Sequence, residues 1–86
     1  MNIDACKRMW VAAIHLDANR ELAHENPDYV SLCEFWLASF AQASQEWQES
    51  LGGYSESSVL VQAVSERCRL EAIEQMAAAM TGMAAI

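Results

Sequence analysis

The chain has 86 residues, of which 53% are hydrophobic, and its twelve carboxylates outnumber its five lysines and arginines, giving a formal net charge of −7. This length allows one domain, spanning residues 1–86, with a thin core, and the apolar surplus favours a homo-oligomer. The charge argues against direct binding to nucleic acid or to an anionic membrane, because phosphate contacts need clustered lysine and arginine.

The cysteines and the two ends of the chain indicate a compartment. Cys6, Cys33 and Cys68 are odd in number and widely spaced, whereas small secreted domains usually carry an even disulfide framework. The N-terminus lacks the basic and apolar segments of a signal peptide. The apolar tail from Met76 is shorter than the about 20 residues that a membrane-spanning helix needs. We therefore expect a cytoplasmic protein.

The first segment contains no proline or glycine and predicts a helix over residues 3–24. One stripe of this helix is apolar, and Arg8, His15 and Asn19 fall on the far side, where His15 is expected at the surface. The stripe then runs on into Asp17 and Glu21, which either project into solvent or face something basic. The apolar stripe consists of Ile3, Cys6, Trp10, Ala13 and Ile14.

Asn26-Pro27-Asp28 marks the start of a second helix, because asparagine caps, proline fits the first turn and aspartate complements the positive helix end. Gly52-Gly53 ends this helix, which is predicted over residues 27–51. Residues at steps of three and four predict a core seam made of Tyr29, Cys33, Trp36, Phe40, Ala43, Trp47 and Leu51.

Two apolar residues, Phe35 and Leu32, depart from the pattern because they point to the polar side of the second helix. Two interpretations stay open. In one, the first or third helix covers Phe35. In the other, Phe35 and Leu32 anchor a partner or a second copy of the chain, with Glu34, Glu46 and Glu49 as an acidic rim.

Ser55-Glu56 begins a third helix, predicted over residues 56–81. It carries two apolar rows on roughly opposite sides, whereas docking on a helical hairpin needs only one. The first row is Val61, Val64, Cys68, Ala72 and Met76. The second row, which we assign to self-association, is Val59, Ala63, Leu70, Ile73, Ala77 and Met80. Residues 82–86 are left open between an ordered end and a disordered tail.

No pattern in the chain predicts catalysis. Each cysteine lies on an apolar stripe, where thiols behave as small inert hydrophobes, and glycine-rich phosphate loops and Cys-x-x-Cys pairs are absent from the sequence. Glu21 and His24 form a Glu-x-x-His step of the kind used in di-iron bundles. No inward-facing glutamate on the second helix completes such a site. We therefore expect no enzyme, cofactor or metal.

The sequence thus predicts an all-α, three-helix antiparallel domain that dimerises through its third helix. The leading functional hypothesis is a small acidic, non-catalytic binding module. It would inhibit or modulate a larger protein with a basic surface patch, such as a nucleic-acid-handling protein, as small proteins of phages and mobile elements do. The alternatives are a self-assembling structural protein and a carboxylate–histidine metal protein.

Overall fold

In the computed structural model, which describes residues 1–84 and the side chains of residues 1–79, the chain forms three α-helices and one short 3-10 turn. They are α1 (Ile3–Glu25), η1 (Pro27–Tyr29), α2 (Val30–Glu49) and α3 (Val59–Ala84). The all-helical, three-helix prediction is confirmed for the described residues. Residues 85 and 86, part of the tail left open above, lie outside them, as does the side chain of Met80.

Short polar side chains set the starts of the helices. The Asn2 side chain accepts a hydrogen bond from the Ala5 backbone N–H, 3.0 Å away, and caps α1. Asn26 accepts one from the backbone N–H of Asp28, as its role as a cap predicts, although the next three residues form a 3-10 turn. The Ser58 hydroxyl accepts a bond from Val61, so α3 begins later than residue 56.

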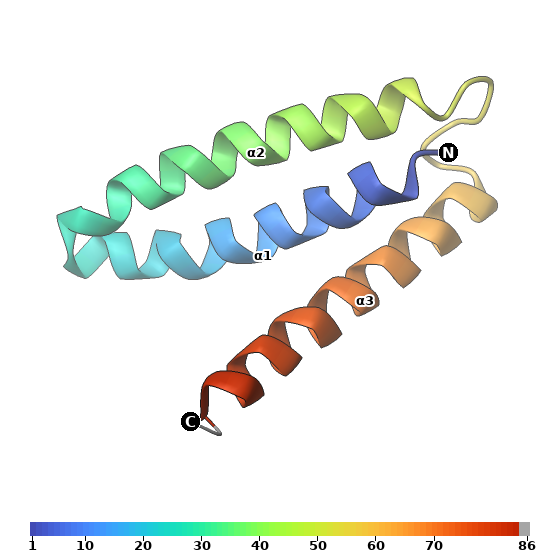
Figure 1. The fold of residues 1–86 in the computed structure, drawn as a ribbon. Coiled ribbons are helices and arrows are strands. Elements are labelled where there is room, and N and C mark those ends of the chain that lie inside the picture. The colour runs from blue at the N-terminus through green and yellow to red at the C-terminus, as the bar shows by residue number, and fades with distance from the viewer. Residues whose placement is uncertain (85–86) are drawn as a thin grey trace.

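The middle helix in space is α1. It packs along α2, with the chain reversing between them at η1, and α3 packs against its other side (Figure 1). Among the described residues, the backbones of α2 and α3 do not approach each other closely. The Cα trace measures 43 × 29 × 16 Å, a flat and elongated shape. The antiparallel packing of all three helices is not shown, because α3 crosses α1 at an angle, and dimerisation remains a prediction.

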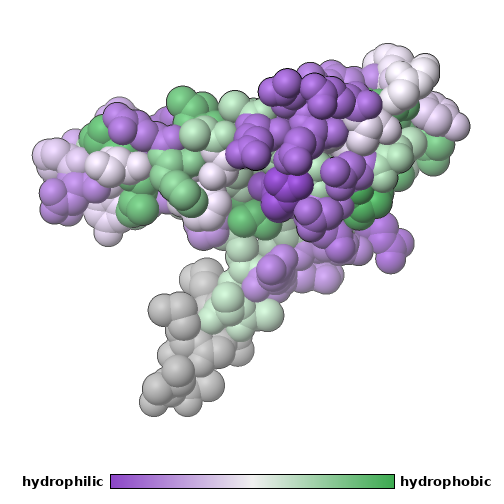
Figure 2. Space-filling model, turned by 45° about the horizontal axis from the view of Figure 1, so that its top comes forward, coloured by the Kyte–Doolittle hydropathy of each residue, from purple (hydrophilic) through white to green (hydrophobic). Residues whose placement is uncertain are grey.

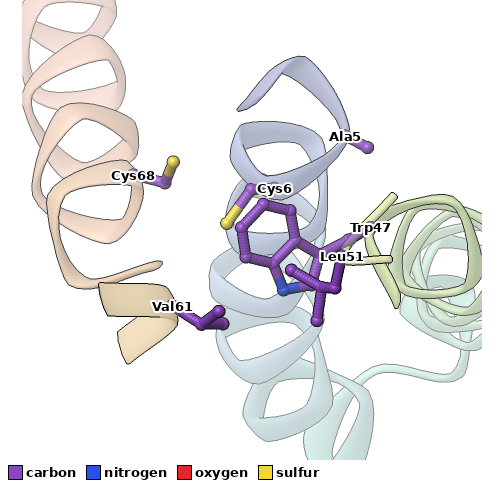
Figure 3. Close-up of a cluster of buried hydrophobic side chains, with 6 residues drawn as sticks. All are labelled: Ala5, Cys6, Trp47, Leu51, Val61 and Cys68. Carbon is purple, nitrogen blue, oxygen red and sulfur yellow. The ribbon is translucent and has the colours of Figure 1, made fainter. Parts of the chain in front are cut away.

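The hydrophobic core lies at the end of the molecule where the first turns of α1, the last turns of α2 and the first half of α3 meet (Figure 3). Trp47 is its largest side chain and is 4% exposed. Beside the core, the indole Nε1 of Trp10 donates a hydrogen bond to the Ser65 hydroxyl, 3.1 Å away, and ties α1 to α3. The buried cluster consists of Ala5, Cys6, Trp47, Leu51, Val61 and Cys68.

The contact between α1 and α2 involves Arg8 and His15, which the sequence pattern placed on the far side of the first helix, away from its apolar stripe. Arg8 reaches across to Glu46, with Nη1 and Oε2 2.8 Å apart. The imidazole of His15 stacks on the indole of Trp36, with ring centroids 4.2 Å apart. His15 is therefore half-buried between the helices rather than a surface histidine. Ala12, on the same side of α1 as these two residues, is 1% exposed.

The acidic continuation of the α1 stripe also has a structural explanation. Ile3, Cys6, Trp10, Asp17 and Glu21 follow one side of α1, which faces α3 near the core. Because α3 diverges from α1 toward its C-terminal end (Figure 1), α3 does not cover the later positions of the stripe. Both carboxylates are exposed, as expected for a projecting helix end.

Candidate functional site

The far end of the α1–α2 hairpin, residues 17–37, extends beyond α3 and is named the hairpin tip (Figure 1). Hydrophobic side chains lie open between hydrophilic ones at this end of the space-filling view (Figure 2). Phe35 is 59% exposed, the largest exposed fraction of any tip hydrophobic. Neither α1 nor α3 covers it, so the covered interpretation of Phe35 does not hold. The exposed large hydrophobic residues of the tip are Leu22, Val30, Leu32, Phe35 and Leu37.

The tip also holds the surplus negative charge. It contains five carboxylates and one arginine, Arg20, so its formal charge is −4 of the total −7. Within the described part of the chain, none of these six groups forms an ion pair. An unpaired acidic surface attracts basic partners and repels anionic ones. The five carboxylates belong to Asp17, Glu21, Glu25, Asp28 and Glu34.

The other four basic side chains are occupied at the opposite end of the molecule. Lys7 pairs with Glu71 at 2.8 Å, and Arg67 lies 3.3 Å from the same carboxylate. Arg8 bridges Asp4 on α1 and Glu46 on α2. Arg69 donates two hydrogen bonds to Glu66. These pairs lower the pKa values of the Glu66 and Glu71 carboxyls from their ordinary value, so the two ends of the molecule differ in electrostatic character.

Phe35 is held in place despite its exposure. Its ring meets that of Trp36 edge-on, with centroids 5.0 Å apart and planes at 78°. Trp36 in turn stacks on His15 of α1. Edge-to-face and stacked aromatic pairs are favourable arrangements. One side of the Phe35 ring is thus supported by the hairpin, while the rest is free to enter a pocket on another molecule.

The predicted partner-binding residues divide into two groups. Leu32 and Phe35 lie three residues apart on one side of α2, and both are exposed, while Glu34 is exposed on a different side. Glu46 lies eleven residues from Phe35, about 16 Å along the helix, and pairs with Arg8. Glu49, near the end of α2, accepts a hydrogen bond from Gln45.

The carboxylates that accompany Phe35 at the tip come mainly from α1 and η1, and the sequence interpretation did not group them with α2. The Asn26-Pro27 turn was the sequence feature that could have predicted this grouping. A short turn between two helices brings the end of the first against the start of the second. Acidic residues on either side of such a turn therefore gather at one end of the hairpin.

A second apolar surface lies on α3. The row of Val61, Cys68 and Ala72 is buried against α1. The opposite row remains exposed, with Leu70 48% and Ile73 43% exposed, and is named the α3 outer face. It consists of Val59, Ala63, Leu70, Ile73 and Ala77 among the described side chains, and the predicted sixth member, Met80, lies outside them.

The structure offers little for catalysis or metal binding in the part that it describes. Burial and the neighbouring Cys68 thiol raise the pKa of Cys6 from 9.0 to about 12, which keeps this thiol protonated and unreactive. Nowhere among the described residues do three or more histidine, cysteine or carboxylate side chains form a group suited to a metal ion. Glu21 and His24 are both exposed at the hairpin tip.

Two of the grooves beside α1 have volumes of about 540 Å³, next to Met9 and Trp47, and about 400 Å³, next to Val11 and Trp36. The second includes Lys7 and Arg8, whose charges are already neutralised by carboxylates. Neither groove therefore presents a free charged group suited to a small anion.

Comparison with known proteins returned no match with a family model, a curated protein or a solved structure. No α-helix within the described residues combines the length and the apolar character needed to cross a membrane.

Proposed function

We propose that this protein is a small acidic binding module without catalytic activity, which inhibits or modulates a larger protein by docking its hairpin tip on a basic surface. The observation that carries this proposal is the coincidence, at one end of the hairpin, of exposed hydrophobic residues with five carboxylates that have no ion pair among the described residues.

The chemistry of the tip defines the partner. Apolar anchors contribute most of the energy of an interface, and surrounding charges steer association and select partners. Phe35 and Leu32 serve as the anchors, and Asp17, Glu21 and Asp28 belong to the surrounding charge. The fitting partner has an apolar pocket rimmed by lysine and arginine. Nucleic-acid-binding proteins carry such basic surfaces, which supports occupancy of a nucleic-acid site by this chain rather than direct contact with nucleic acid.

The proposed setting is the cytoplasm, with a phage or mobile element as the class of source. Three free cysteines support a reducing compartment. Small size and acidity are typical of inhibitors from such sources, and this part of the proposal rests on that analogy.

The test is affinity capture from host lysate at about 0.1 M salt, followed by binding measurements with the purified partner. Phe35→Ser and Leu32→Ser should each weaken binding about 30-fold, the effect of losing an interface anchor. Leu60→Ser is a matched control, because Leu60 has a similar exposed fraction, 50% against 44% for Leu32, but lies on α3.

The charge requirement is tested separately. A triple Glu21→Gln, Glu25→Gln and Glu34→Gln variant should slow association and remove most of its salt dependence. Glu56→Gln, in the loop before α3, is the control and should change neither. The proposal would be contradicted by a partner that binds Phe35→Ser and Leu32→Ser as tightly as the wild type, or by a partner whose contact surface is acidic.

A further inference from the structure

We infer that the α3 outer face binds a second copy of this chain, pairing two α3 helices in opposite directions around a twofold axis between Leu70 and Ile73. This surface is separate from the hairpin tip, so the inference does not depend on the proposed function.

The total surface of the chain supports an interface of this kind. Its accessible surface is 6039 Å², whereas a compact monomer of its mass, 9.6 kDa, exposes about 5,100 Å². The excess of about 900 Å² is close to the roughly 800 Å² that each partner contributes to a standard interface. The excess is a property of the whole chain, the hairpin tip included, and it is large enough for one such interface.

Charge decides which apolar surface a second copy can occupy. Two hairpin tips brought together would place −4 against −4, with no basic side chain beyond Arg20 to compensate. The part of α3 from residue 59 to residue 79 contains three carboxylates and two arginines, a formal charge of −1. Like-charge contact across an interface is strongly unfavourable. A second copy therefore fits α3, and the tip is left for a basic partner.

The flanks of the α3 outer face are complementary to themselves when reversed. Arg67 and Glu74 lie seven residues apart, two turns along one side of the row. With Leu70 facing Ile73 of the second copy, the twofold axis brings Arg67 near Glu74 of the other copy, and the pair occurs twice. Flanking charge pairs of this kind set the direction and register of paired helices.

The ion pairs within the chain show which arginine is available. Arg69 donates two hydrogen bonds to Glu66 and is therefore already paired within the chain. This pair also neutralises the Glu66 carboxylate, which lies at the edge of the row. Arg67 is 83% exposed and makes one longer contact, at 3.3 Å, with a carboxylate that Lys7 already holds at 2.8 Å. Glu74 is exposed and makes no ion pair with the described residues. Arg67, which has only this one longer contact, and Glu74 can therefore meet across the axis.

Oligomeric state provides the first test, by light scattering and sedimentation of the whole chain between about 5 and about 500 µM. The wild type should form a dimer. Leu70→Ser and Ile73→Ser should each raise its dissociation constant at least about a hundredfold, because the twofold removes two buried side chains. Leu60→Ser, at an exposed α3 position outside the row, should leave the dimer intact.

The register of the two helices is tested by reversing the charges of Arg67 and Glu74. These substitutions leave the apolar row unchanged, and they should have little effect on folding because both positions are exposed. Arg67→Glu and Glu74→Arg should each weaken the dimer roughly tenfold. The double variant should return to within about threefold of the wild type. A wild type that stays monomeric at the highest concentration would overturn the inference, as would a dimer that survives Leu70→Ser in a variant whose circular dichroism is still helical. Additive losses in the double variant would overturn the register.

Discussion

Replacing Phe35 with alanine should affect the binding of a partner far more than the stability of the fold. Complete burial of a phenylalanine side chain contributes about 1.5–3 kcal/mol, and Phe35 is 59% exposed, so its covered part contributes about 1 kcal/mol. Loss of the edge contact with Trp36 adds roughly 0.5 kcal/mol, and the better helix propensity of alanine returns about as much. The free energy of unfolding should therefore fall by about 1 kcal/mol.

The assay is urea denaturation of the wild type and of Phe35→Ala, with Trp47→Ala as the comparison. Trp47 is 4% exposed in the core, and its truncation should cost about 3–5 kcal/mol. The same Phe35→Ala protein should lose about 2 kcal/mol or more of binding energy toward the captured partner. A loss of about 3 kcal/mol in the stability of Phe35→Ala would show that this ring belongs to the core and would refute its role as an anchor.

Three further predictions concern the fold. Because burial holds the pKa of Cys6 at about 12 in the folded chain against 9.0 ordinarily, its stabilising contribution is complete below pH 9 and is lost as the pH rises toward 12. When the free energy of unfolding is measured at several alkaline pH values, it should fall less steeply with pH for Cys6→Ala than for the wild type, by up to about 1.4 kcal/mol per pH unit. Equal pH dependence in the two proteins would contradict this cause. Trp10→Phe and Ser65→Ala should each cost about 1 kcal/mol, and a double-mutant cycle should show coupling between them, because they share one hydrogen bond. Gly52→Ala should cost about 1–2 kcal/mol because its φ is +62°, whereas Gly53→Ala, with open space at its Cβ and no positive φ, should cost far less in the same denaturation measurement.

Helix number and approximate bounds follow from local signals in the sequence. The Asn26 cap, Pro27 and the glycines after α2 act through the backbone of their own neighbours, so they can be identified without knowing the fold. The start of α3 was less well defined because several serines precede it. Ser58, rather than Ser55, accepts the capping hydrogen bond, and any serine in such a run can cap a helix.

The position of α1 between its neighbours could not be inferred from apolar periodicity. Its contact with α2 uses Arg8 and His15, which an apolar pattern does not reveal because these polar side chains join the interface only through partners on the other helix. The third helix, although it carries two apolar rows, packs against α1 alone among the described helices. Its second row, including Leu70 and Ile73, is exposed in the single chain, which is why it is open to a second copy.

The sequence drew attention to Leu32 and Phe35 but left open whether Phe35 is covered, and it did not group the charges of the tip. Leu32 and Phe35 interrupt the polar side of α2, a pattern visible in the sequence, and both are exposed. Whether a carboxylate is unpaired depends on side chains distant in sequence, as the pair of Glu46 with Arg8 shows. The grouping of unpaired carboxylates at the tip therefore required the arrangement of the helices.

The central claim is that the two exposed apolar surfaces take different partners, and hydrogen–deuterium exchange tests it most directly. The protein would be measured dilute, concentrated, and in complex with the captured partner. We predict that concentration slows exchange along α3 near Leu70 and Ile73, and that the heterologous partner slows it at residues 17–37. Protection at the tip on concentration alone, or protection of α3 by the partner with none at the tip, would contradict the account.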